Sequence, residues 1–353
     1  MKIVVTGASG NIGTALLRVL AGEDHEVVGV ARRRPDTAAA PYSSARWVQQ
    51  DVGANDAWPE LTGTFTGADA VVHLAWAIHP RADDPAMLRT NMAGSANVLR
   101  AAADAGVEHV VCASSVAAYT PANRWDEVDE GWPCGGLADS AYSAGKAAFE
   151  SKLDEFCRDH PGIRVARIRP CGVVQPDAAA EFSGWLLSPL APPLPLGRKW
   201  LPVPLWPGLR MQVVHSDDVA RAILAILDRR ATGAFNLAGD SVLKSRDLAA
   251  LAGGIRIPVP LRLLTGLAWP SWRLGLQPLH PSWLRLADRA SLVDTRRARE
   301  ELGWRPRHDA ASTITDLLAA IRAGRRGDSR PLDPPRDRVR LGRPSHQDQS
   351  TGR

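Results

Sequence analysis

Tyr142 and Lys146 are the two residues of this chain whose types and spacing best suit acid–base chemistry. They are four apart in a segment whose apolar residues (Phe149, Leu153, Phe156) have helical spacing, so both side chains should share one helical face. A lysine ammonium close to a phenol favours the phenolate and lowers the tyrosine pKa, which makes the tyrosine a usable proton carrier at neutral pH. An isolated pair with this spacing usually means two surface residues, so its interpretation depends on its surroundings.

Two serines, Ser114 and Ser115, follow an apolar run that predicts a buried strand over residues 107–113. The carboxyl ends of strands in an open parallel sheet lie where ligands bind. A serine hydroxyl at such an end could hold the oxygen of a substrate. The next loop, residues 119–138, contains Pro121, Pro133, Gly135 and Gly136 and is long enough to be functional.

Residues 6–13, Thr-Gly-Ala-Ser-Gly-Asn-Ile-Gly, lie between an apolar run and a helical pattern and predict strand, glycine turn and helix. Gly7 permits the tight turn, Gly10 lets backbone approach a ligand, and Gly13 allows close packing of helix on strand. The free N–H groups at the helix start suit a pyrophosphate. A second strand over residues 26–31 completes a βαβ unit, which favours a dinucleotide site over an ordinary turn.

The residues after the second strand indicate which dinucleotide is bound. Ala31 stands where an acidic residue would hold the ribose 2′-OH, and Arg32 and Arg33 follow it. Arginine accommodates a 2′-phosphate, so we expect NADP as the cofactor, with NAD as the alternative. A solvated basic turn is the competing interpretation. Asp51, after a short strand over residues 46–50, is a candidate partner for the adenine amino group.

Composition narrows the class of protein. With 353 residues and 45% hydrophobic content, the chain can bury a large core. Its four cysteines show no C-x-x-C spacing, so we expect reduced thiols and no metal site. We find no signal peptide and no apolar segment long enough to span a bilayer, and therefore expect a cytoplasmic protein.

The basic charge is concentrated at the end of the chain. From Arg325 onward, eight arginines and four aspartates account for +4 of the formal net charge of +5. The body is therefore almost neutral, and we expect no nucleic-acid partner; binding through the tail would rest only on scattered arginines. Residues 325–353 are rich in Pro, Arg, Asp and Gly without apolar periodicity, which predicts a disordered basic tail.

Over about residues 1–320 the chain resembles an extended short-chain dehydrogenase/reductase of the NAD-dependent epimerase/dehydratase family. The resemblance implies an α/β fold, a Rossmann-type doubly wound parallel sheet with a smaller C-terminal substrate-binding subdomain. It is carried by the glycine turn together with Asp51-Val52, His73-Leu74-Ala75, Asn91, Ser114-Ser115 before Tyr119, Tyr142, Lys146, Arg169-Pro170 and residues 214–220, 235–239 and 302–306.

The resemblance also implies domain boundaries. Residues 1–174, with 210–240 returning to them, would form the dinucleotide-binding domain, and residues 175–209 and 241–324 the substrate-binding subdomain. That subdomain is rich in tryptophan, which suits a lid and a mostly apolar pocket. We expect no membrane partner, because the prolines between 189 and 207 forbid a continuous amphipathic helix there.

Carried onto this chain, the family pattern makes Tyr142 the catalytic acid/base, Lys146 the residue that orients the nicotinamide ribose, and Ser115 the active-site serine, with Ser114 as the second candidate. The expected cofactor-binding residues are Gly7, Ser9, Gly10, Asn11, Ile12, Gly13, Arg32, Arg33, Asp51, Val52, Leu74, Ala75, Asn91, Tyr142 and Lys146.

The reaction implied is hydride transfer at a hydroxyl or carbonyl carbon of a small molecule: a sugar, a nucleotide-sugar-like compound, or another keto or hydroxy compound. Arg210 lies five residues before His215, whereas nucleotide-sugar enzymes of the family usually place an arginine four before it, so a nucleotide sugar is in doubt. A non-catalytic NADP-binding sensor on the same fold is the alternative. Family members often form homodimers through helices that here lie near 87–105 and 141–159.

Overall fold

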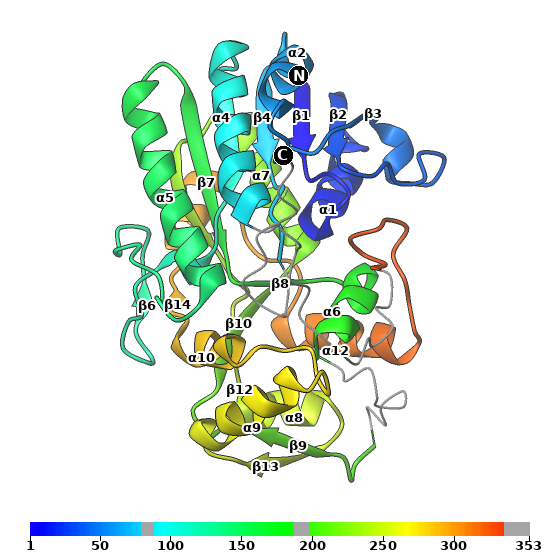
Figure 1. The fold of residues 1–353 in the computed structure, drawn as a ribbon, viewed down its shortest axis with the longest axis vertical. Helices are drawn as coiled ribbons and strands as arrows, with labels where there is room; N and C mark the ends of the chain where they lie inside the picture. The colour runs from blue at the N-terminus through cyan, green and yellow to red at the C-terminus, as the bar shows by residue number, and fades with distance from the viewer. Residues whose placement is uncertain (79–87, 187–197, 335–353) are drawn as a thin grey trace, which may run out of the picture.

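The computed structural model describes residues 1–78, 88–186 and 198–334. Its centre is a seven-stranded parallel sheet with strand order β11-β7-β5-β4-β1-β2-β3 (Figure 1). The order reverses direction between β1 and β4, and sheets of this kind bind ligands at that point, outside the carboxyl ends of the strands. The predicted Rossmann-type doubly wound fold is confirmed. The strands are β1 (Lys2–Thr6), β2 (Glu26–Ala31), β3 (Arg46–Gln49), β4 (Ala70–His73), β5 (His109–Ala113), β7 (Arg164–Pro170) and β11 (Gly233–Leu237).

Helices cover both faces of the sheet because its strands are apolar on both sides. Alternate residues of β1 point to opposite faces, so Ile3 and Val5 enter one core cluster and Val4 enters another. The first cluster includes leucines of α1 (Asn11–Leu20) and isoleucines of α7 (Ser216–Arg229). The second is closed by α2 (Ala57–Phe65), α4 (Gly94–Asp104) and α5 (Ala141–Asp159).

The remaining strands form three small sheets. In one, β10 (Arg210–His215) lies between β8 (Gly172–Val174) and β12 (Val242–Lys244). The other two are parallel pairs: β9 (Pro202–Leu205) with β13 (Ile255–Pro258), and β6 (Glu127–Val128) with β14 (Leu292–Val293). Helices α8 (Ser245–Leu251) and α9 (Leu261–Arg273) lie with β9 and β13 at the lower end of Figure 1, away from the seven-stranded sheet.

The other helices connect these parts. They are α6 (Ala179–Leu186), α10 (Pro281–Arg289), α11 (Arg296–Leu302) and α12 (Ala310–Arg322), with short helical turns at Tyr42–Ser44, Arg89–Ala93, Val116–Ala118 and Pro176–Ala178. Among the described helices, none combines the length and the apolar character needed to cross a bilayer. Residues 79–87, 187–197 and 335–353 lie outside the described residues; they include the start of the helix predicted at 87, part of the proline-rich stretch and most of the predicted tail.

Residues 325–334 pack against the start of the chain. Leu332 is fully buried, and Ser329 Oγ donates a 2.6 Å hydrogen bond to the carbonyl oxygen of Ser9. Arg325 pairs with Asp177 at 2.6 Å. The prediction of a disordered tail from Arg325 is therefore wrong for residues 325–334, because one leucine and one serine give this polar segment buried contacts that its composition does not reveal.

We predict that Leu332→Ala lowers the free energy of unfolding by about 2–5 kcal/mol, the usual cost of truncating a buried leucine. Removal of residues 325–353 should likewise lower the melting temperature. The matched control is Leu263→Ala, because Leu263 is 52% exposed and its truncation should change stability little. Urea denaturation measures both variants, and equal midpoints for the two would contradict the packing of this segment.

Candidate active site

The glycine turn is built so that neither Gly7 nor Gly13 can carry a side chain. Gly7 has φ +72°, and a Cβ there would lie 2.6 Å from the backbone nitrogen of Ala75. A Cβ on Gly13 would clash with the carbonyl oxygen of Gly7. The turn therefore lies directly against the end of β4 at Leu74 and Ala75, and the N-terminus of α1 follows Gly10. This backbone cradle fits the diphosphate of a dinucleotide.

The side chain of Asn11 fixes this turn to β8. Its Nδ2 donates to the carbonyl oxygen of Val173 at 3.0 Å, while its Oδ1 accepts hydrogen bonds from Ser216 at 2.6 Å and Gln175 at 2.8 Å. Asn11 was expected to bind the cofactor; the structure gives its side chain a structural role within the turn. Ser9 and Ile12 lie on the same turn.

Arg32 and Arg33 are exposed at the carboxyl end of β2. Beside them, Asp51 accepts hydrogen bonds from Arg89 at 2.9 Å and from the Gly53 N–H at 3.0 Å. Burial raises the pKa of Asp51, but these hydrogen bonds and the charges of Arg89 and Arg32 outweigh it, so the pKa lies below its ordinary value. The ionised carboxylate of Asp51 and the exposed guanidinium groups of Arg32 and Arg33 therefore lie at the same edge of the site. The part played by Arg89 was not foreseen.

Asn91 and Val52 support the site from within the protein. The Asn91 amide bonds both backbone groups of Ala77, accepting from its N–H at 2.7 Å and donating to its carbonyl at 2.9 Å. Val52 is buried in the second core cluster with Val98. Both residues thus hold loops in place, and their direct contact with a cofactor stays a prediction.

Helix α5 carries Tyr142 and Lys146 on its first two turns, as predicted. Its start is capped by Ser140, whose Oγ accepts the Ser143 N–H at 3.4 Å. Ser115, just after β5, lies beside Tyr142, and its hydroxyl favours the phenolate form of the tyrosine. The structure therefore brings Ser115, Tyr142 and Lys146 to one place, and the contact with Tyr142 favours Ser115 over Ser114.

The pKa values of this pair differ from the expectation. Lys146 Nζ donates to the Ala113 carbonyl at 2.8 Å and lies 3.5 Å from the centre of the Trp76 ring. Burial lowers the pKa of Lys146 to about 7. Burial also raises the pKa of Tyr142, and the nearby Ser115 hydroxyl offsets this only in part. The expected lowering of the tyrosine pKa by Lys146 is not found, because the ammonium is directed at Ala113 and Trp76.

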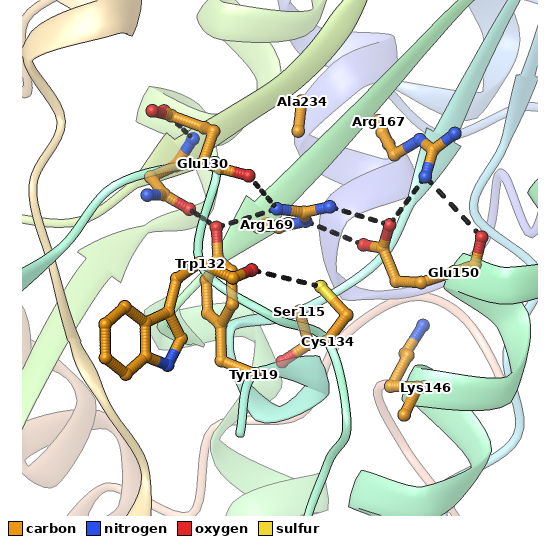
Figure 2. Close-up of polar contacts among 12 residues, drawn as sticks. Ser115, Tyr119, Glu130, Trp132, Cys134, Lys146, Glu150, Arg167, Arg169 and Ala234 are labelled. Carbon is orange, nitrogen blue, oxygen red and sulfur yellow. Dashed lines mark hydrogen bonds and ion pairs between the residues drawn. The ribbon is translucent and has the colours of Figure 1, made fainter. Parts of the chain in front are cut away.

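A buried ion-pair network lies next to Ser115 and Lys146 (Figure 2). Arg169 bonds Glu150 at 2.8 and 2.9 Å and Tyr119 at 2.9 Å, and Arg167 bonds the same carboxylate at 2.9 Å. Burial raises the pKa of Glu150, but the Arg169 hydrogen bond and the two positive charges lower it to about 2. Lys146 lies one turn before Glu150 on α5, so the network fixes the helix that carries Tyr142 and Lys146.

Aromatic side chains from α10 and α6 lie beside Tyr142. Its ring centre lies 5.2 Å from that of Trp283 on α10, and Trp283 in turn stacks on Trp185 of α6 at 6.5 Å. Phe182 lies 5.3 Å from Trp185. The predicted use of tryptophans 185 and 283 in the substrate pocket is consistent with this arrangement. We call these four rings the aromatic cluster.

Glu181, one turn before Trp185 on α6, was missed in the sequence. Among the described residues it has no hydrogen-bond or ion-pair partner, and burial raises its pKa to about 8. A signal did exist, because Glu181 is the only charged residue between Asp177 and Arg198. A protonated carboxyl next to the aromatic cluster can donate a hydrogen bond to a substrate.

His215, Asp217 and His308 also lie together, at the start of α7. Their polar atoms already have protein partners: His215 Nδ1 accepts the Asp217 N–H at 3.1 Å, and Asp217 pairs with Arg18 at 2.7 Å. His308 Nδ1 lies 3.0 Å from Asp218. We therefore interpret the cluster as a helix cap and assign it no metal.

A protein-family model described as the NAD dependent epimerase/dehydratase family matches residues 3–238. The chain belongs to this family. An uncharacterized protein of Mycobacterium tuberculosis is 29% identical over 328 residues, which cover 91% of this chain but 30% of that protein. The chain thus spans about a third of the length of that relative. A UDP-glucose 4-epimerase of Mycolicibacterium smegmatis is 28% identical, with 91% of this chain and 99% of the relative covered.

Solved structures of the family share the fold. A UDP-glucose 4-epimerase of Thermotoga maritima with UDP-glucose superposes with TM-score 0.68 at 21% identity, covering 92% of this chain and 99% of its own. A UDP-glucose 4-epimerase of Thermus thermophilus in complex with NAD gives TM-score 0.67 at 22% identity, covering 91% and 99%. At this identity the likeness concerns architecture.

We predict that Glu150→Gln destabilises the fold by about 3–5 kcal/mol, because it leaves two buried guanidinium groups without their shared charge. Glu155→Gln, an exposed position on the same helix, is the matched control. With a folded pKa of about 2 against 4.5 for an ordinary glutamate, the Glu150 carboxylate stabilises fully above about pH 4.5 and progressively less as the pH falls toward 2. Urea denaturation between pH 7 and pH 3 should show Glu150→Gln converging toward the wild type as acidity rises, while Glu155→Gln stays close to the wild type throughout.

Proposed function

We propose that this protein is an NAD(P)-dependent oxidoreductase or epimerase that transfers hydride at a hydroxyl or carbonyl carbon of a small molecule, with Tyr142 as acid/base. The observation that carries the proposal is that Ser115, at the carboxyl end of β5, lies beside Tyr142 and that Lys146 follows one turn further along α5. Membership of the family supports it. We assign residues 1–174 and 210–240 to dinucleotide binding, and 175–209 and 241–324 to the substrate.

Each side chain then has one task. The nicotinamide of the bound dinucleotide supplies or accepts the hydride. Ser115 positions the substrate oxygen, and Tyr142 Oη gives that oxygen a proton during reduction or takes one during oxidation. Lys146 has a pKa of about 7 and can therefore gain or lose a proton near neutral pH. Its charge would then help to offset the charge on Tyr142 when the tyrosine gives up its proton. Trp283 covers Tyr142 and limits the access of water.

The surroundings of Tyr142 favour a substrate other than a nucleotide sugar. Arg210, the candidate for holding a diphosphate, is buried and donates to the carbonyl oxygens of Arg124 and Asp288, the latter at 3.0 Å. Those bonds would have to break before it could bind phosphate. The aromatic cluster and Glu181 suit a keto or hydroxy compound with an apolar ring or chain, which Glu181 could orient through a hydroxyl.

We predict that Tyr142→Phe lowers turnover at least ~10²-fold, since it removes the transferable proton and keeps the ring. The assay follows reduced dinucleotide with a panel of aryl and alkyl ketones, sugars and UDP-glucose. Tyr42→Phe is the matched control, because it removes a buried hydroxyl that bonds Thr14 at 3.1 Å. Dinucleotide affinity should be the same in both variants.

Equal turnover by Tyr142→Phe and wild type would show that Tyr142 is not the acid/base. A protein that binds dinucleotide tightly yet turns over no member of the panel would instead favour the non-catalytic sensor.

We further propose a preference for NADP(H) over NAD(H). Ala31 offers no acceptor to a ribose diol, while Arg32 and Arg33 present charged donors to a 2′-phosphate at the exposed end of β2. A charge-assisted contact of this kind contributes about 1.5–3 kcal/mol, or roughly ten- to a hundredfold in affinity.

Calorimetric titration of both dinucleotides tests this preference. Arg32→Ala should weaken NADP binding about tenfold or more and leave NAD binding unchanged, and added salt should shrink the difference. Arg34→Ala, an exposed arginine two residues further on, controls for general charge. Equal or tighter binding of NAD by the wild type would rule out the preference, without touching the assignment of Tyr142.

A further inference from the structure

The outer face of α9 is apolar and exposed. Leu263, Leu267 and Trp269 are 52%, 60% and 52% exposed, and no residue of this helix is fully buried. Helical spacing places Leu263 and Leu267 on one face, with Arg262 and Arg273 beside them. Helices of soluble proteins normally bury such leucines in a core. Their exposure here indicates that this face of α9 is an interaction surface for an apolar partner.

The neighbouring strand pair continues the apolar surface. In β13, Ile255 and Ile257 are exposed, and they pair in register with the exposed prolines Pro202 and Pro204 of β9. The prolines lack N–H groups, which disfavours strand pairing with a second copy of the chain. We call β9, β13, α9 and the exposed Trp200 the subdomain tip; its strands and helix lie together at the lower end of Figure 1.

The charge of the subdomain tip has one sign. Residues 182–216 and 248–287 contain no aspartate or glutamate. Cations at and beside the tip that form no ion pair with any described residue are Arg198, Lys199, Arg256, Arg262 and Arg273. Two of them lie over tryptophan rings: Arg273 over Trp269 at 5.1 Å and Arg198 over Trp200 at 5.8 Å.

We propose that the subdomain tip docks on an anionic lipid surface. Exposed leucine and tryptophan together with unpaired arginine and lysine is the composition of segments that lie in the membrane interface. A second copy of this chain fits less well, because a symmetric contact would bring the same cations against each other. The prolines between 189 and 207 forbid a continuous helix there, but at the tip Pro202 and Pro204 lie in strand β9, and the apolar helical face is supplied by α9.

Co-sedimentation of the full chain with vesicles tests the inference. We expect binding to phosphatidylcholine vesicles that contain phosphatidylglycerol, little binding to phosphatidylcholine alone, and loss of binding as salt is raised. The double variant Arg262→Glu/Arg273→Glu should bind at least about tenfold more weakly. Leu267→Ser should also weaken binding, because it removes apolar contact and leaves the charge unchanged.

The matched control is Arg46→Glu/Arg158→Glu, which reverses two exposed arginines on β3 and α5 and should bind like the wild type. Equal loss in both double variants, or no binding to anionic vesicles, would overturn the proposal. So would a dimer in sedimentation velocity that Leu267→Ser dissociates, since the face would then bind a second copy. None of these variants touches Ser115, Tyr142 or Lys146, so the outcome is independent of the proposed reaction.

Discussion

The site depends on one buried carboxylate shared by two arginines. Taking Glu150, Arg167 and Arg169 out of water is costly, and only complete pairing offsets that cost. Arg169 also bonds Tyr119 and the carbonyl oxygen of Glu130, so the network joins β7, α5 and the loop after β5. The two elements that supply Ser115 and the Tyr142–Lys146 pair are thereby locked to each other. Any shift of α5 along its axis would separate Glu150 from its arginines. The ion pairs therefore fix the position of Tyr142 and Lys146 on this helix.

Local patterns predicted part of the architecture, and the family resemblance predicted the doubly wound sheet as a whole. Apolar runs predicted β1, β2, β3 and β5, and the spacing of glycines predicted the turn, where Gly7 and Gly13 have no room for a Cβ. Contacts between distant residues carry no such pattern. Ser329 bonds Ser9 across 320 positions, and Glu150 meets Arg169 only after α5 and β7 have packed. The same holds for the partners of Lys146, because the position of Trp76 follows from the loop after β4.

Burial explains why the tyrosine–lysine pair departs from the simple expectation. Burial removes water from both side chains and disfavours the charged form of each. The pKa of Tyr142 therefore rises and that of Lys146 falls. The Ala113 carbonyl and the Trp76 ring stabilise the ammonium without adding a negative charge. The proton therefore stays on the phenol at neutral pH; in the proposed reaction it would move only when a substrate oxygen beside Ser115 accepts or supplies one.

Helix α10 links Tyr142 to the subdomain tip. It carries Trp283 against Tyr142, and it packs against α9, whose outer face belongs to the subdomain tip. Its Asp288 accepts hydrogen bonds from Arg124 and Trp206 and through its backbone holds Arg210, so the helix cannot move without breaking buried bonds. The contacts of α9 and of Tyr142 are thus both made with α10, which is held rigidly. A surface that orients the tip would also fix the direction from which a substrate reaches Trp283 and Tyr142.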